Sequence, residues 1–231
     1  MYIYLYLNIF TIFFPFVLSF DKRVQFYKNW PFLLPAILFN ATIFILWDSI
    51  FTHIGVWGFN PDYLVGWFLF GLPLEEWLFF FTVPYACVFI YETLNTYIKK
   101  DFLQPYAPWL TVILLIVLVP LGLWFLPRLY TSVTFLALAA MLVLHFVLLK
   151  NYKIGRFYAA YFVHLIPFLL VNGVLTAIPI VWYNNQYNLG IRITTIPAED
   201  TMYSMLMLLI TITVYELLKR RKQKQIPIVP V

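Results

Sequence analysis

Residues 108–126 read PWLTVILLIVLVPLGLWFL and contain no charged side chain. A helix needs about 20 mostly apolar residues to cross the hydrocarbon core of a bilayer. This stretch therefore predicts a helix that crosses a membrane. The number of apolar stretches of similar length on either side of it predicts the number of further membrane-spanning helices.

The composition of the whole chain agrees with a membrane protein. Of its 231 residues, 63% are hydrophobic and 21% aromatic, and only 11% are charged, against about 25% charged in an average globular protein. A chain of this size must cover a large outer surface when it folds, and there is too little charge for that surface to face water. A water-soluble enzyme, a disordered chain and a fibrous repeat are excluded.

Six further apolar stretches resemble the first. With it they predict an all-α integral membrane protein of seven transmembrane helices, at residues 2–20, 30–51, 73–91, 108–126, 129–149, 157–181 and 197–218. The N-terminal stretch, residues 2–20, lacks the basic start and the cleavage site of a signal peptide, so we expect it to be a retained helix. Two longer connectors, residues 52–72 and 182–196, are weakly charged and are expected to fold back against the membrane face.

Basic residues are distributed unevenly among the connectors. Thirteen follow odd-numbered spans, whereas Arg128 and Arg192 follow even-numbered ones. Cytoplasmic connectors carry the excess of Lys and Arg, which predicts a cell-membrane protein with its N-terminus outside and its C-terminus in the cytoplasm. The net charge of +5 therefore does not indicate a nucleic-acid partner. The thirteen residues are Lys22, Arg23, Lys28, Lys99, Lys100, Lys150, Lys153, Arg156, Lys219, Arg220, Arg221, Lys222 and Lys224.

An internal repeat relates the two halves of the chain. A shift of 124 residues aligns residues 48–92 with 172–216 without a gap, and nine positions are identical, among them Pro73/Pro197 and Glu75/Glu199. The repeat predicts a first three-helix unit at 1–98, a connecting helix at 99–128, and a second unit with a basic tail at 129–231. Four spans separate equivalent helices, so both units point the same way and their pseudo-two-fold axis runs along the membrane normal.

Acidic residues inside the spans are the best candidates for chemistry, because an ionisable group in a bilayer is costly. Glu75 and Glu76 follow Pro73 at the start of one helix, and Glu199 and Asp200 follow Pro197 at the start of another. Acids in a first turn often stabilise only the helix. Their occurrence in both repeats favours catalysis, since neighbouring carboxyl groups can share a proton and act as general acid and base.

Three other acids occupy related positions. Asp48 ends the second span on the same side as Glu75 and is expected near it, with Asn172 as its counterpart. Glu92 and Glu216 lie at the opposite helix ends beside basic residues, so we expect them to form ion pairs at the membrane interface.

Several cofactor classes find no support in the sequence. His53, His145 and His164 are too scattered for a di-iron centre, and the single cysteine, Cys87, excludes a cysteine-based metal site. There is no Gly-x-Gly-x-x-Gly motif for a dinucleotide and no Asp-x-x-x-Asp pair for magnesium diphosphate. The last span has no lysine before Lys219 for a retinal Schiff base. We expect neither metal nor cofactor.

The motifs resemble the integral-membrane lycopene cyclase domain, found as two-subunit bacterial enzymes and as fused archaeal, bacterial and fungal forms. The resemblance rests on Trp47-Asp48, on 56–61 (VWGFNP), on 71–80 (GLPLEEWLFF) and on Tyr91-Glu92. In the second half it rests on Asn172-Gly173, Arg192, 196–200 (IPAED) and Tyr215-Glu216. The resemblance covers nearly the whole chain and both repeats, so the chain is similar to the fused forms, in which both halves are one polypeptide.

The resemblance implies a redox-neutral cyclisation of lycopene to γ-carotene and then β-carotene by a lycopene β-cyclase, an isomerase. Its acid and base would come from Glu75, Glu76, Glu199 and Asp200. Because Asp48/Asn172 and Phe68/Arg192 break the symmetry near these acids, we expect one pocket shared by both halves. Residues expected to bind substrate or support the acids are Asp48, Trp57, Asn60, Asn172, Asn184 and Arg192.

Partners implied are lycopene, other acyclic or monocyclic carotenes, membrane lipid and other enzymes of carotenoid synthesis. Three alternatives stay open: a cyclase for another acyclic carotenoid, a hydratase that adds water to the same cation, and a non-enzymatic membrane transporter or scaffold.

Overall fold

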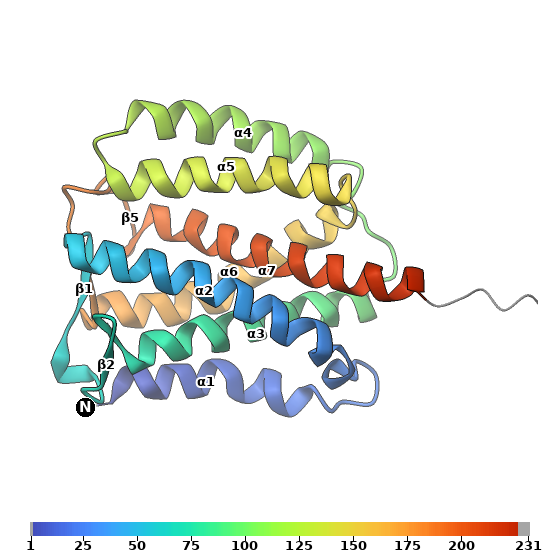
Figure 1. Ribbon diagram of the computed structural model, residues 1–231, viewed down its shortest axis with the longest axis horizontal. Helices are drawn as coiled ribbons and strands as arrows, with labels where there is room; N and C mark the ends of the chain where they lie inside the picture. Colours follow the sequence, from blue (N-terminus) through green and yellow to red (C-terminus); the bar gives the residue numbers. More distant parts are fainter. Residues whose placement is uncertain (1, 226–231) are drawn as a thin grey trace, which may run out of the picture.

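The computed structural model describes residues 2–225, which form one bundle of α-helices running side by side (Figure 1). The helices are α1 (Ile3–Leu18), α2 (Trp30–Ile54), α3 (Leu74–Tyr97), α4 (Ala107–Trp124), α5 (Leu129–Leu149), α6 (Ile154–Ala177) and α7 (Ala198–Gln225). The side chain of Lys224 and residues 226–231 of the predicted basic tail lie outside the described residues.

The predicted class, an all-α membrane protein, is confirmed. Within the described chain, six helices are long and apolar enough to cross a membrane, and α1 is a shorter apolar helix of 16 residues. The prediction for α5 matches both ends, whereas α3 and α7 extend past the predicted ends, Tyr91 and Leu218. Hydropathy marks where the apolar stretch stops, and the backbone hydrogen bonds of these helices continue into their polar ends.

The predicted sixth span is wrong at its end. Helix α6 stops at Ala177, and Val181 lies in a strand instead. The two longer connectors form three two-stranded antiparallel sheets at one end of the bundle (Figure 1). Their elements are β1 (Trp57–Phe59), the 3₁₀-helix η2 (Pro61–Tyr63), β2 (Phe68–Leu69), β3 (Leu72–Pro73), β4 (Val181–Tyr183), β5 (Arg192–Ile193) and β6 (Ile196–Pro197).

The elements of one connector recur in the other at the spacing of the sequence repeat. Strands β1, β2 and β3 begin 124 residues before β4, β5 and β6, and α3 begins 124 residues before α7. Strand β1 pairs with β4, with Gly58 opposite Trp182. Two flanking backbone bonds are reciprocal, since the Asn60 N–H donates to the Ile180 carbonyl and the Asn184 N–H to the Val56 carbonyl, both at 2.9 Å.

Helix packing joins the two halves. Helix α1 packs on α3 and α5 on α7, whereas α2 also packs on α7 and α6 on α3. The outer helix α4 packs mainly on α5 and lies at the rim (Figure 1). Each half is therefore completed by a helix of the other.

A reciprocal polar contact closes the opposite end of the bundle. Tyr91 donates to Glu216 and Tyr215 donates to Glu92, each at 2.8 Å. Lys153 pairs with Glu216 and Lys219 with Glu92, both at 2.9 Å. The ion pairs expected of Glu92 and Glu216 are thus present. The thirteen basic residues, which lie in connectors or in the adjoining helix ends, are also at this end (Figure 1).

Candidate active site

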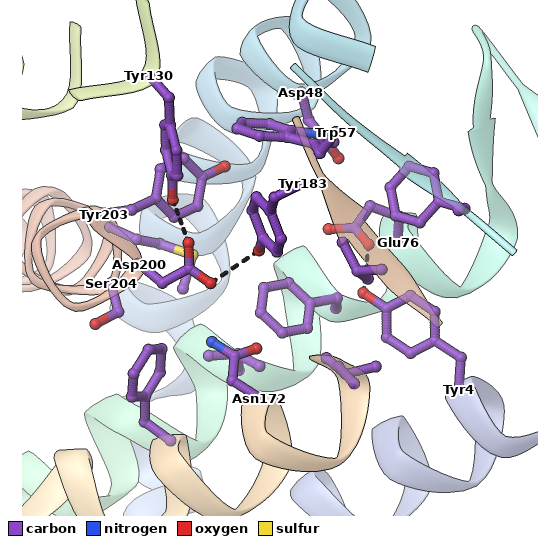
Figure 2. Close-up of a pocket in the computed structure, with 17 residues that line it drawn as sticks. Tyr4, Asp48, Trp57, Glu76, Tyr130, Asn172, Tyr183, Asp200, Tyr203 and Ser204 are labelled. Atoms are coloured by element: carbon purple, nitrogen blue, oxygen red, sulfur yellow. Dashed lines mark hydrogen bonds between the residues drawn. The ribbon is translucent and has the colours of Figure 1, made fainter. Parts of the chain in front are cut away.

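A cavity lies beneath the paired strands β1 and β4. Three carboxyl groups line it, from Asp48 on α2, Glu76 on α3 and Asp200 on α7 (Figure 2). The rest of its lining is largely aromatic and aliphatic. In the described part of the chain, no lysine, arginine or histidine lines the cavity.

Most lining residues are related by the 124-residue shift, so the cavity lies where the two halves meet. The chemical identities within these pairs differ, and the cavity is therefore asymmetric. The pairs are Asp48/Asn172, Trp57/Val181, Phe59/Tyr183, Glu76/Asp200, Phe79/Tyr203 and Val83/Met207.

Glu76 and Asp48 form one acidic group. Glu76 lies in the first turn of α3 and accepts a hydrogen bond from the Tyr4 hydroxyl of α1. The Asp48 carboxyl is close enough to interact with that of Glu76, and it accepts a hydrogen bond from the Trp57 indole N–H. Asp48 thus faces Glu76 and not, as expected, Glu75. Two adjacent carboxyl groups in this arrangement can share one proton.

Asp200 is surrounded differently. It lies in the first turn of α7 and accepts hydrogen bonds from Tyr130 at 2.6 Å and from Tyr183 at 2.8 Å (Figure 2). Burial, and then the charge of Asp200, raise the pKa of Tyr183 well above its usual value, so this phenol stays a donor. Two phenol donors suit an ionised carboxylate, which can only accept.

Glu75 and Glu199 are fully buried but do not line the cavity. Glu75 accepts a hydrogen bond from the backbone N–H of Val65 at 2.5 Å, and Glu199 accepts from that of Leu189 at 2.7 Å and from the Thr131 hydroxyl at 2.6 Å. Each carboxyl group thereby ties a connector to the helix that follows it.

Glycine is required next to both of these contacts. Gly66 and Gly190 directly follow the two donor residues and have φ angles of 93° and 72°. A positive φ is easy only for glycine, which gives a structural reason for its presence at both positions.

The remaining predicted residues divide into two groups. Trp57 and Asn172 line the cavity. Asn60 and Asn184 accept backbone N–H groups two residues ahead in tight turns, and Arg192 donates to Asn185 and Asn188. These three lie outside the lining and hold the connectors in shape.

Sequence reasoning missed the tyrosines that contact the acids. Tyr4 and Tyr130 occupy equivalent places on α1 and α5, each donating to a cavity carboxyl. Their separation of 126 residues differs from the 124-residue shift, so a gapless alignment cannot pair them. A search that allowed a two-residue gap before the second span would have found them.

The lining suits acid–base chemistry on an apolar molecule. Three ionised carboxylates without a cation are strongly unfavourable away from water, so at least one of the three carries a proton. The aromatic faces of Trp57, Phe59 and Phe79 surround these groups and can stabilise a cation. Within the described residues, no cluster of three His, Cys, Asp or Glu side chains suits a metal ion.

A comparison with protein families agrees with this chemistry. The model of a family described as lycopene cyclase matches residues 1–94 and 127–218. None of the curated proteins and none of the solved structures matches the chain. The two matched segments leave out all of α4 and contain all three cavity acids, and they make up most of the sequence. The chain belongs to the lycopene cyclase family, whose members are carotenoid cyclases.

Proposed function

We propose that this protein is a lycopene β-cyclase in which the Asp48–Glu76 group donates a proton to the substrate and Asp200 accepts a different proton from the ring. The observation that carries this assignment is the difference between the two acidic environments. One is a pair of carboxyl groups able to share a proton, and the other is a single carboxyl group that receives two phenol donors.

The reaction is an isomerisation, so it needs one proton delivered and one removed. Protonation of the terminal alkene of the linear end group gives a tertiary cation. The internal alkene attacks this cation, and a carbon–carbon bond closes the six-membered ring. Loss of a ring proton to Asp200 leaves the β-ring double bond. An acid and a base with different surroundings are the requirement for such a sequence.

Aromatic rings around the acids support the cationic step. Trp57, Phe59, Phe79 and Tyr203 line the cavity, and a desolvated cation over an aromatic face gains about 2 kcal/mol. Most of the lining is apolar, which favours ring closure and loss of a proton over addition of water to the cation. This argues for a cyclase over a hydratase.

We propose further that residues 1–98 and 129–231 are duplicated units joined by α4, in a cell-membrane protein with an external N-terminus. The thirteen basic residues at one end of the bundle support this orientation. Single cysteines at Lys100 and Arg128, in a Cys87→Ala background, should be labelled from opposite sides of the membrane. Labelling of both from one side would contradict it.

Expression in a host that accumulates lycopene tests the proposed function directly. We expect γ-carotene and β-carotene, identified by chromatography and absorbance, and unchanged lycopene with Glu76→Gln. A hydroxylated linear carotenoid would indicate the hydratase, a ring of another type would overturn the β assignment, and lycopene from the wild-type chain would indicate a non-enzymatic role or another substrate.

A further inference from the structure

A second cavity, which we call the lateral groove, opens beside the active site between α1, α3 and α6. It has an almost entirely apolar lining that includes Phe10, Phe14, Ala86 and Val171. Phe10 and Phe14 are more than half exposed on the outer face of α1. In a bilayer this face contacts lipid, so the groove opens toward the hydrocarbon.

The lateral groove adjoins the acid cavity. Phe79 and Val83 on α3, and Phe168 and Asn172 on α6, line both. Figure 2 shows Asn172 on α6 at the edge of the acid cavity. From Phe79 to Ile90 the groove follows α3 for about 16 Å, at 1.5 Å per residue.

The corresponding passage in the other half is filled by aromatic rings. The 124-residue shift relates Phe79 to Tyr203, Phe168 to Phe44 and Val171 to Trp47. The rings of Phe44 and Tyr203 have centroids 4.9 Å apart, and those of Trp47 and Tyr203 5.4 Å apart. An indole thus stands where the open half has a valine, and within the described residues these rings fill the pseudo-symmetric counterpart of the lateral groove.

We infer that the lateral groove holds the polyene chain of a linear carotene while the end group lies in the acid cavity. This rests on the proposed function, because it takes its occupant from it. A hydrocarbon chain without polar groups matches the apolar lining, and the side chains that the groove shares with the acid cavity place the end group at the inner end, beside the acids. The carotene enters from the lipid between α1 and α6.

Val171→Trp tests the inference by copying the closed half into the open one. The experiment is done in a Glu76→Gln background, where the proposed reaction does not consume the ligand. After expression in a lycopene-producing host, the purified protein is assayed for bound polyene by its visible absorbance. We expect Val171→Trp to lower the bound polyene by about tenfold, since an indole overfills the groove.

Two further variants control for folding. Val163→Trp adds the same side chain to α6 at a half-exposed position outside the groove, and it should retain the polyene. Ala86→Leu narrows the groove from α3 and should lower binding again. Unchanged binding in both groove variants, or an equal loss with Val163→Trp, would overturn the inference. Because binding is measured without turnover, a chain that binds polyene in the groove but makes no ring would contradict only the proposed function.

Discussion

Glu75 and Glu76 are neighbours in sequence, but the first turn of α3 directs them to different surroundings. Glu76 lines the cavity, and Glu75 accepts the Val65 N–H outside it. The same division separates Asp200 from Glu199. Consecutive helix residues point about 100° apart, so one acid of each pair is available for chemistry and the other secures a connector.

Replacing each glutamate by glutamine should separate these roles. Glu76→Gln removes the exchangeable proton and should lower ring formation by about 10²–10⁴-fold. Glu75→Gln retains an oxygen that accepts the Val65 N–H, so ring formation per folded molecule should persist while the melting temperature falls. Product yields and thermal unfolding of the purified variants measure both effects. An inactive but fully stable Glu75→Gln protein would contradict this division.

The phenol donors of Asp200 provide a second prediction. Tyr183→Phe removes the 2.8 Å bond to the carboxyl. Since a hydrogen bond to a charged group contributes about 1.5–3 kcal/mol, we expect cyclisation about ten- to a hundredfold slower. Tyr161→Phe is the matched control, because its hydroxyl donates to the Thr201 carbonyl and does not line the cavity. Equal rates in the two variants would show that Asp200 does not depend on this donor.

The sequence predicts which acids matter more readily than what each one does. Repeat-related carboxyls stand out because charge is rare in the spans, and all three cavity acids were among them. Phenols such as Tyr4 and Tyr130 do not stand out among 17 tyrosines. Their role depends on which face of α1 and α5 meets the acids, and neither helix has a strong polar pattern to reveal that face.

At the scale of elements, the pairing of β1 with β4 positions much of the active site. The two three-residue strands carry Trp57, Phe59, Val181 and Tyr183 into the cavity lining. At their centre Gly58 lies against the Trp182 indole, and a Cβ atom there would overlap the ring. Close approach of the two strands therefore requires glycine at position 58.

Gly58→Ala should separate the strands. We expect a loss of about 1–3 kcal/mol in the free energy of unfolding, typical of overpacking, together with slower cyclisation, because Trp57 and Tyr183 move with the strands. Gly173→Ala, in α6 with open space around its Cα, is the matched control and should be tolerated. Chemical unfolding in detergent compares the two. If Gly58→Ala proved as stable as Gly173→Ala, the contact with Trp182 would not constrain the strands.

Helices were easier to predict than strands for a physical reason. A span such as α5 is long, contains no Asp, Glu, Lys or Arg and is bounded by Arg128 and Lys150, so its ends are visible in the sequence. Strand β4 has only three residues, Val181–Tyr183, and continues an apolar run from α6. Its conformation depends on pairing with β1, more than a hundred residues away, and no local pattern encodes that contact.

At the scale of the whole molecule, the two halves are held together by non-covalent contacts at both ends of the bundle as well as by the connecting helix α4. Tyr91 and Tyr215 exchange hydrogen bonds with Glu216 and Glu92, and β1 pairs with β4 at the other end. Helix α4 packs mainly on α5 and contributes nothing to the cavity lining. The interface should therefore persist when the chain is cut before α4.

Co-expression of residues 1–98 and 99–231 as separate chains should give an assembled, active complex, and each chain alone should be inactive because the acids come from both. Affinity purification through one chain and assay of ring formation measure this. Tyr91→Phe combined with Tyr215→Phe should weaken the association. Activity from either chain alone would contradict a shared active site.

The aromatic side chains that close one passage have a consequence for the order of events. The proposed substrate, lycopene, has two identical ends, and the lateral groove admits one end at a time. After the first ring closes, the molecule must back out into the bilayer, turn end for end and thread in again. Catalysis is then distributive, which means that the monocyclic product is released before it is bound again. Dilution of the enzyme in the membrane, with no other change, would therefore raise the ratio of monocyclic to bicyclic product.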